Sequence, residues 1–309
     1  MKPLPQDDLQ AIVDAVDWEP LRGARILLTG GTGFLGRWLM ESFILANRQH
    51  DLKATMFATM AHTQIHETDE VRAIIWDIAL GRYPDQPPGT ITHCIHAACP
   101  SCAVPPVSDL EMFRVIVNGT QNVMKWCVDN GAKRVLYLSS GAAVYRPDTT
   151  YGLAKKAAEM VCGLYAENHE MDVSIARIYS LVGPGLPLDG HFAIGNFIRD
   201  AIAGRPVQVV GGESILRSYL YVSDAVTRLW GLAISPFGGS TVGSHDPITI
   251  RDLAGLVGKV LRAHVVYTLG GFRADTYLPP QGAHLGRPPR VSLKDAILKT
   301  ARWHGWEPK

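Results

Sequence analysis

The sequence predicts an α/β protein built on a doubly wound, parallel sheet with a smaller, mixed C-terminal lobe. Three observations support this. Apolar runs alternate with segments of helical apolar spacing from about residue 25 to 180, as in βαβ units with right-handed crossovers. A glycine-rich turn joins the first run to the first long helix. After Ile178, glycine and proline become frequent, as in "LVGPGLPLDG", which indicates loops and short elements.

Each element follows from its local apolar pattern. Leu9, Ile12, Val13 and Val16 have helical spacing, so we expect a leading helix over 7–17 that packs on the body or on a second subunit. Short apolar runs predict strands and longer periodic segments predict helices. In chain order they are strand 24–30, helix 34–48, strands 52–60, 71–78 and 93–99, helix 109–131, strand 133–140, helix 151–168 and strand 172–180.

Composition and charge exclude several classes of protein. Thirty basic residues face twenty-nine acidic ones, which argues against nucleic acid or an anionic membrane as a partner. No apolar run reaches the roughly 18 residues of a membrane helix, and the N-terminus lacks a signal-peptide core. The five cysteines fit reduced thiols, and the single Cys99/Cys102 pair lacks zinc-site spacing. We expect a cytoplasmic protein without a metal.

The glycine-rich turn "LLTGGTGFLG" predicts a Rossmann-type dinucleotide site. Gly30, Gly33 and Gly36 lie between a strand and a helix, where glycine lets the backbone approach a pyrophosphate at the helix start. A purely structural turn is the alternative. The second strand ends "MFATMAHTQ" without an acid or arginine, so the choice between NAD and NADP stays open. Thr59 or His62 is a candidate for the ribose contact, or simply a loop residue.

Tyr151 and Lys155 stand four residues apart at the start of a predicted helix, so both side chains lie on one face. A phenol has a pKa near 10, which is too high for a base at neutral pH. A neighbouring ammonium and an oxidised nicotinamide would stabilise the phenolate. The pair therefore predicts proton transfer by Tyr151.

The segments "TGGTGFLG", "HAA", "NGTQNV", "SSGAAVY", "YGLAKKAAE" and "RSYLYVSDAV" resemble the extended short-chain dehydrogenase/reductase family. Within it, the NAD-dependent epimerase/dehydratase group acting on nucleotide sugars is most similar, over nearly the whole chain. The resemblance implies a dinucleotide-binding domain over 1–177, with 222–248 returning to it, and a substrate-binding lobe over 178–309. It also implies a homodimer formed through the helices within 107–129 and 151–168.

Roles follow from the resemblance by position. Tyr151 is the acid/base, Lys155 holds the nicotinamide ribose, and a serine ending the fifth strand binds the reacting oxygen. Arg217 and Asn196 bind the substrate diphosphate, and Asp224 is structural. The implied cofactor contacts are Gly30, Thr32, Gly33, Phe34, Leu35, Gly36, Asp77, Ile78, Ala97, Ala98, Asn118, Tyr151 and Lys155.

Several of these roles have a simpler alternative interpretation. Asp77 either meets the adenine or is an ordinary exposed aspartate, and Asn118 either supports the central helix or caps it. Arg217 can form a surface salt bridge, and Asn196 can face solvent. His96 in "HAA" is expected to bond backbone near the cofactor.

The position of the catalytic serine depends on how it is counted. Counting along "RVLYLSS" gives Ser140, whereas counting back from "VY" gives Gly141. Strand geometry favours Ser140, so we assign it to catalysis and to substrate binding. Ser139 is the reserve, and a serine that only caps the strand is the alternative.

Two features depart from the resembled family. Its dehydratases carry an Asp–Glu pair after this serine and related decarboxylases a glutamate, but this chain has Gly141, Ala142 and Ala143. We therefore expect dehydratases and decarboxylases to be disfavoured. The connection from Ser140 to Tyr151 is also far shorter than in the relatives. It indicates an open pocket, an unusual sugar, or a wall supplied by a partner chain.

The resulting expectation is an NAD(P)-dependent nucleotide-sugar epimerase that works through a transient ketone, at C4 of the sugar. The first alternative is an NADPH-dependent reductase of a 4-keto nucleotide sugar, which needs the same residues. A reductase of small carbonyl compounds would not need Arg217. A non-catalytic NAD(P)-binding protein is the alternative from another class, and the short connection before Tyr151 is its best support.

Overall fold

The computed structural model describes residues 2–60, 67–81, 83–84, 89–100, 107–190, 192–210, 215–235, 239–268, 275–283 and 289–308. The chain divides into two compact units. The larger unit comprises 6–178 and 226–240, and the smaller unit comprises 1–5, 179–225 and 241–309. The division falls one residue beyond the boundary expected at 177. The segment that returns is shorter than the expected 222–248.

The larger unit contains most of the regular elements. In chain order these are α1 (Gln6–Val13), a 3-10 turn (Glu19–Leu21), β1 (Arg25–Thr29), α2 (Phe34–Gln49), β2 (Thr55–Met60), β3 (Val71–Ile75), β4 (His93–His96), α3 (Asp109–Asp129), β5 (Arg134–Ser140), α4 (Ala142–Tyr145), α5 (Thr150–His169) and β6 (Asp172–Ile178). The division between the units falls within α7 (Val222–Ile234) and within β11 (Gly239–Val242).

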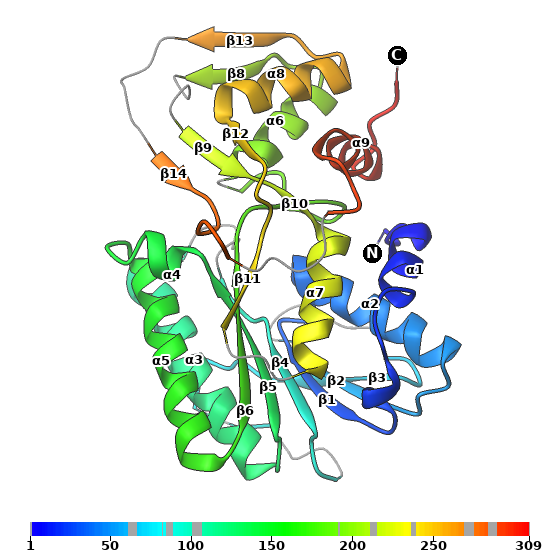
Figure 1. Cartoon of the computed structure of the whole chain (residues 1–309), viewed down its shortest axis with the longest axis vertical. Coiled ribbons are helices and arrows are strands. Elements are labelled where there is room, and N and C mark those ends of the chain that lie inside the picture. Colours follow the sequence, from blue (N-terminus) through cyan, green and yellow to red (C-terminus); the bar gives the residue numbers. More distant parts are fainter. Residues whose placement is uncertain are drawn as a thin grey trace. The chain divides into compact units, whose positions relative to one another are not determined.

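One sheet of seven strands organises the larger unit, in the order β11-β6-β5-β4-β1-β2-β3 (Figure 1). From β3 to β6 all neighbours pair in parallel, with Thr29 opposite His96 and Ser140 opposite Ile178. This confirms the predicted doubly wound α/β fold. Strand order reverses at β1, between β2 and β4, so the carboxyl ends of β1 and β4 frame the expected ligand crevice.

Helices α3 and α5 pack against each other on one face of the sheet (Figure 1). The core on this face joins Trp76, Trp126 and Tyr137 to apolar side chains of both helices. Its cysteines, Cys94, Cys127 and Cys162, are buried free thiols. Cys99 is also a free thiol, whereas Cys102 lies outside the described residues.

The leading helix packs on the body of the larger unit. Leu9, Ile12 and Val13 are buried, and α1 contacts α2. The helix ends at Val13, four residues earlier than expected, because the chain turns there. The Trp18 indole donates to the Val13 carbonyl (3.0 Å) and packs 4.9 Å from the Trp230 ring.

Two strands also end earlier than expected. Strand β3 stops at Ile75 rather than 78, since Asp77 accepts the Ala79 N–H and forms a turn (3.0 Å). Strand β4 stops at His96 rather than 99. Within the described residues, no helix has the length and apolar character that a membrane span requires.

The smaller unit is built from short strands and three packed helices. Its elements are β7 (Leu181–Val182), α6 (Ala193–Ile202), β8 (Val207–Val210), β9 (Ile215–Ser218), β10 (Leu220–Tyr221), β12 (Pro247–Thr249), α8 (Ile250–Leu261), β13 (Val265–Thr268), β14 (Asp275–Tyr277) and α9 (Leu293–Trp303). The strands pair as β10-β7, β12-β9-β14 and β13-β8. Helices α6, α8 and α9 pack against one another.

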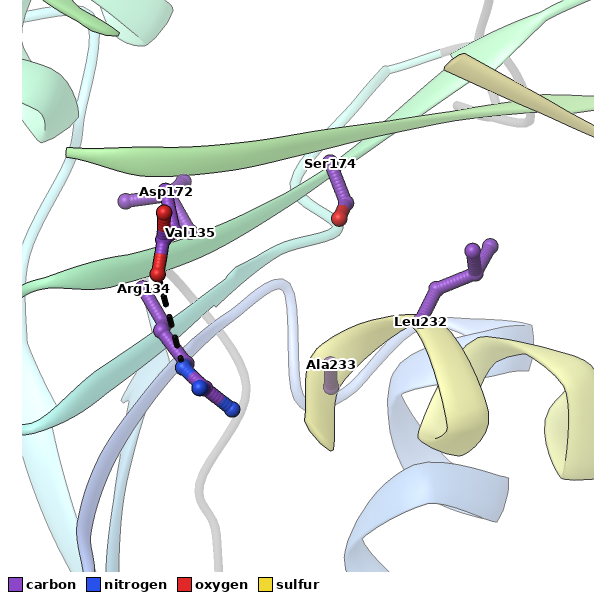
Figure 2. Close-up of a pocket in the computed structure, with 6 residues that line it drawn as sticks. All are labelled: Arg134, Val135, Asp172, Ser174, Leu232 and Ala233. Carbon is purple, nitrogen blue, oxygen red and sulfur yellow. Dashed lines mark ion pairs between the residues drawn. The ribbon is translucent and has the colours of Figure 1, made fainter. Parts of the chain in front are cut away.

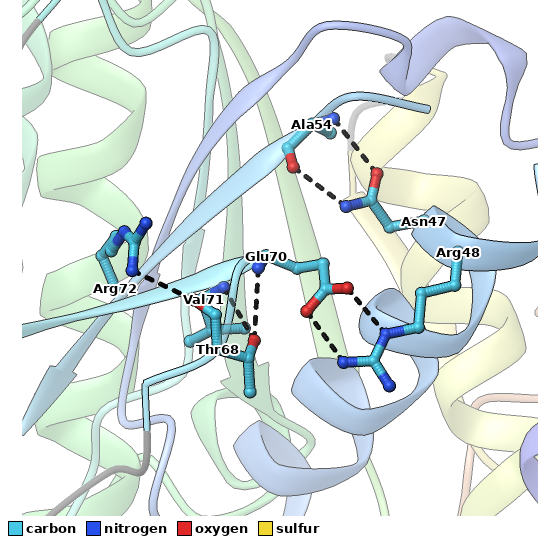
Figure 3. A network of polar contacts seen from close by, with 7 residues as sticks. All are labelled: Asn47, Arg48, Ala54, Thr68, Glu70, Val71 and Arg72. Atoms are coloured by element: carbon cyan, nitrogen blue, oxygen red, sulfur yellow. Dashed lines mark hydrogen bonds and ion pairs between the residues drawn. The ribbon is translucent and has the colours of Figure 1, made fainter. Parts of the chain in front are cut away.

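A polar network ties the end of α2 to the starts of β2 and β3 (Figure 3). The Asn47 amide exchanges two hydrogen bonds with the Ala54 backbone (3.0 and 3.1 Å). The Arg48 guanidinium donates to both carboxylate oxygens of Glu70 (2.6 and 3.0 Å), and Thr68 Oγ1 accepts the Glu70 N–H (3.2 Å). The hydrogen bond from Arg48 lowers the pKa of Glu70 to about 2.

The Glu70→Gln variant tests this network through pH. The pKa of Glu70 is depressed on folding, so its contribution is fully present above about pH 4.3 and is lost as the pH falls towards 2. We expect the variant to be less stable by about 1 kcal/mol or less at pH 7, since Arg48 is mostly exposed. Urea unfolding from pH 7 to pH 3 should show the difference shrinking, with exposed Glu167→Gln as control. A constant difference would contradict the assignment.

Candidate active site

The glycine turn after β1 can be built only with glycine at two positions. Gly30 has φ +72°, and a Cβ there would lie 2.7 Å from the Ala98 Cα. A Cβ on Gly36 would lie 2.0 Å from the Gly30 carbonyl oxygen. The turn is therefore pressed against the end of β4, where Ala97 also lies.

The start of α2 fits a pyrophosphate. Gly33 is the N-cap residue and is exposed, and it offers no side chain to the first N–H groups of the helix. Thr32, Phe34 and Leu35 flank this start and are half-buried. Uncapped N–H groups at a helix start favour an anion. The residues present thus fit the diphosphate of a dinucleotide.

A series of hydrogen bonds through His96 supports the glycine turn that follows β1. Thr120 Oγ1 donates to the Ile116 carbonyl (2.6 Å), so His96 Nε2 donates to Thr120 Oγ1 (3.1 Å). His96 Nδ1 then accepts from Thr29 Oγ1 (2.7 Å), which itself accepts the Ala98 N–H (3.2 Å). His96 bonds two side chains, not the backbone as expected.

The His96 imidazole is neutral within this series of hydrogen bonds. Burial, reinforced by the charge of Lys155, lowers the pKa of His96 to about 3. A neutral ring with one N–H is what the hydrogen-bond directions require. The series links the ends of β1 and β4 to α3, and it makes His96 a positioning residue. Thr29 and Thr120 carried no sequence signal for this role.

The residues expected to contact the adenine and the ribose differ in their burial. Asp77 is half-buried in its turn, and Ile78 packs on Gly119, where a Cβ would lie 2.9 Å from Ile78 Cδ1. Asn118, next to this contact, is exposed on α3. Thr59 is buried and its Oγ1 accepts the Gly30 N–H (3.4 Å), so it serves the turn. His62 lies outside the described residues.

Lys155 is buried, and it is held by β5. Its Nζ donates to the Leu138 carbonyl (2.8 Å) and lies 4.9 Å from the centre of the Tyr137 ring, an arrangement that stabilises an ammonium. Tyr151, one helical turn earlier, is partly buried against the core beneath α5. The structure therefore holds both residues at the carboxyl end of β5.

Glu159 continues the same face of α5 one turn beyond Lys155. Ser139 Oγ donates to Glu159 Oε1 (2.6 Å), and the Arg177 guanidinium donates to both carboxylate oxygens (2.9 and 2.7 Å). Ser139 and Arg177 are register partners in β5 and β6. Ser139, the reserve for the catalytic serine, thus has a structural partner. The i+4 spacing of 151, 155 and 159 was the available signal for Glu159.

Ser140 is buried at the end of β5, and its Oγ accepts the Ala142 N–H (3.2 Å). Because side chains alternate along a strand, Ser140 points to the face opposite Ser139. Its catalytic role stays a prediction. Gly141 is the N-cap of α4.

The short connection to Tyr151 consists of α4 and one turn. Thr149 caps α5 by accepting the Gly152 N–H (3.1 Å). A Cβ on Gly152 would lie 1.8 Å from the Arg146 carbonyl oxygen. The turn is therefore packed directly on α5, and Gly152 permits that approach.

The expected diphosphate ligands belong to the smaller unit. Asn196 lines a cavity of 390 Å³ between α6, β8 and β9, and its Oδ1 accepts from Arg199 (3.1 Å). Arg217 forms an ion pair with Asp275 (2.6 Å). Asp224 has the expected structural role, since it accepts from the Arg290 side chain (2.9 Å) and backbone (3.1 Å).

A small polar pocket lies within the larger unit (Figure 2). Arg134 and Asp172 begin β5 and β6, and they form an ion pair on one side of it (3.8 Å). Leu232 and Ala233 of α7 line its other side. It lies at the amino ends of the strands, whereas the glycine turn and Lys155 lie at the carboxyl ends.

Comparison with known proteins agrees with this geometry. The family model described as "NAD dependent epimerase/dehydratase family" matches residues 26–239. UDP-glucuronic acid decarboxylase 6 of Arabidopsis thaliana is 25% identical over 92% of this chain and 84% of its own length. The match confirms the resemblance noted in the sequence, and the family description names NAD.

Solved structures share the fold. An epimerase of Methanothermobacter thermautotrophicus superposes with a TM-score of 0.77 at 22% identity, covering 96% of this chain and 95% of its own. A dTDP-glucose 4,6-dehydratase of Streptomyces venezuelae gives 0.76 at 22% identity, covering 91% and 96%.

The expectation that decarboxylases and dehydratases are disfavoured is wrong. Several relatives that align over more than nine-tenths of this chain are named UDP-glucuronic acid decarboxylases, and dehydratases share its fold. The expectation rested on residues 141–143 alone. A fold can bring an acidic group to the same place from another segment, so three neutral residues do not exclude these reactions.

Replacing Gly30 by alanine tests the turn. We expect Gly30→Ala to destabilise the protein by more than about 2 kcal/mol and to abolish NAD binding, because of the backbone clash and the positive φ. Gly163→Ala is the matched control, since a Cβ there meets nothing within 4 Å; in a helix it should stabilise by about 0.5–1 kcal/mol. Urea unfolding and NAD titration measure both. Unchanged NAD affinity in Gly30→Ala would refute the assignment.

Two substitutions separate a structural from a catalytic Ser139. Ser139→Ala should lower the free energy of unfolding by about 1–3 kcal/mol, since Glu159 loses a buried donor. Glu159→Ala should cost about 2–3 kcal/mol, because Ser139 and the partly exposed Arg177 both lose their acceptor. Turnover per folded molecule of Ser139→Ala should stay unchanged. A variant of native stability that had lost turnover would show that Ser139 acts on the substrate.

Proposed function

Because the chain belongs to the NAD-dependent epimerase/dehydratase family, we propose that it oxidises a nucleotide sugar at C4 to a transient ketone. The observation that carries this proposal is the placement of Lys155. Its ammonium is buried, held 2.8 Å from the Leu138 carbonyl, and one helical turn from Tyr151. The pair lies at the same edge of the sheet as the Gly30–Gly36 turn.

In the proposed reaction, bound NAD supplies the hydride acceptor. Tyr151, as phenolate, removes the proton of the sugar hydroxyl, and the Lys155 ammonium stabilises that phenolate. The glycine turn and the N–H groups at the start of α2 hold the dinucleotide diphosphate. Ser140 is assigned to the reacting oxygen, and its Oγ accepts the Ala142 N–H.

The ketone can have two fates, each favoured by a different observation. Epimerisation needs only the return of hydride to the other face of the ketone, which suits the neutral residues 141–143. Decarboxylation is favoured by the names of the curated relatives. A 4-keto uronic acid is a β-keto acid, so the C5–C6 bond breaks, CO₂ leaves, and the C4 carbonyl accepts the electron pair. Proton return to C5 then yields a nucleotide 4-ketopentose, and return of the hydride to C4 would give the nucleotide pentose.

The smaller unit is proposed to bind the nucleotide. The 390 Å³ cavity at Asn196 is of a size that suits a small-molecule group, and Arg217 offers the planar donor fork that suits phosphate. A homodimer also stays a prediction. Exposed Leu153, Met160 and Leu164 along α5 fit a helix face that a second copy covers.

A product assay with a Tyr151 variant tests the function. We expect the protein with NAD to convert UDP-glucose to its C4 epimer, or UDP-glucuronic acid to a UDP-pentose and CO₂, followed by NMR. Tyr151→Phe should lower turnover by about 10²–10⁴-fold, because the proton acceptor is lost, while NAD affinity is kept. Tyr145→Phe on α4 is the control.

Two results would contradict the proposal. Full turnover in Tyr151→Phe would exclude the phenolate mechanism. NAD binding with no turnover on any nucleotide sugar would instead favour a non-catalytic, NAD-binding protein.

A further inference from the structure

Arg217 is engaged by a neighbouring strand of its own unit. Strands β9 and β14 pair in parallel, with Arg217 opposite Tyr277. Asp275 lies two residues before Tyr277, so both side chains are on the same side of β14. Arg217 Nη2 donates to Asp275 Oδ2 (2.6 Å). The guanidinium also lies 5.8 Å from the centre of the Tyr277 ring.

The two terminal nitrogens of the Arg217 guanidinium, Nη1 and Nη2, have different partners. Nη1 donates to the backbone carbonyls of Leu216 (2.8 Å) and Asp275 (3.2 Å), whereas Nη2 donates to the Asp275 carboxylate. The two side chains are only 20% and 17% exposed, so their attraction is screened less than that of a surface pair. The backbone contacts hold the arginine in place, and the carboxylate balances its charge.

We propose that Asp275 is a resident counter-anion of the diphosphate site and sets its selectivity. Its carboxylate occupies a donor of Arg217 that a substrate diphosphate needs, so binding exchanges one anion for another. A diphosphate carries enough charge to displace or share the contact, and an uncharged nucleoside does not. This inference rests on the proposed function, in which Arg217 binds the diphosphate of a nucleotide sugar.

The exchange leaves the local fold intact. The pairing of Asp275 with Ile215 and of Thr276 with Leu216 is a backbone register, and the Asp275 carbonyl keeps its contact with Nη1. The Tyr277 ring still faces the guanidinium. The carboxylate can therefore move without loss of strand pairing, and replacing it by an amide of the same shape preserves the site.

The test is isothermal titration of UDP and of uridine into the wild-type protein and Asp275→Asn at low ionic strength. We expect the variant to bind UDP about fivefold more tightly or better, because the competing negative charge is gone. Uridine affinity should not change. Glu307→Gln is the control: it removes an exposed carboxylate of the same unit and should leave UDP affinity unchanged.

The titrations distinguish failure of this inference from failure of the proposed function. Tighter binding of UDP alone supports the exchange. Unchanged or weaker UDP binding in Asp275→Asn overturns it, and shows that Asp275 only orients Arg217, while the proposed function stands because the wild type binds UDP. If neither protein binds UDP, the proposed nucleotide-sugar substrate fails, and the inference fails with it. Circular dichroism of each variant establishes that it is folded.

Discussion

The burial of the Lys155 ammonium is the constraint on which the larger unit depends. A buried charge is costly unless polar groups surround it, and here the Leu138 carbonyl and the face of Tyr137 meet that need. One turn further along α5, Glu159 draws Ser139 and Arg177 to a single carboxylate. These two contacts fix the height and rotation of α5 over β5, and therefore the position of Tyr151.

The cofactor turn is held by a different kind of interaction. Gly30 and Gly36 remove the side chains that would separate the turn from β4 and from α2. The Thr29–His96–Thr120 chain then fills the space beneath with directional hydrogen bonds. Close backbone approach and buried hydrogen bonds have complementary effects. The first leaves room for the proposed dinucleotide, and the second keeps the ends of β1 and β4 from shifting.

The buried charged side chains of the two units differ in how their hydrogen bonds are satisfied. In the larger unit, the buried Glu159 carboxylate is held by Ser139 and Arg177 of the same unit. In the smaller unit, Arg217 shares its donors between backbone and carboxylate, and only the second contact can be replaced by a ligand. In the proposed function, different residues therefore carry out the reaction and bind the substrate diphosphate.

The sequence by itself determined the order of the strands and helices, the doubly wound sheet, the glycine turn and the Tyr151/Lys155 pair. Each of these depends on local spacing: period two or 3.6, a glycine triplet, or residues four apart on one helix. Tertiary structure alone decided what Thr29, His96, Glu159 and Asp275 do, because their partners lie on other elements of the chain. It also turned Ser139 towards Glu159 and Ser140 to the opposite face, since strand alternation acts only once the start and register of β5 are known. Residues 141–143 do not decide the reaction for the same reason: a catalytic group need not be near in sequence to be near in space.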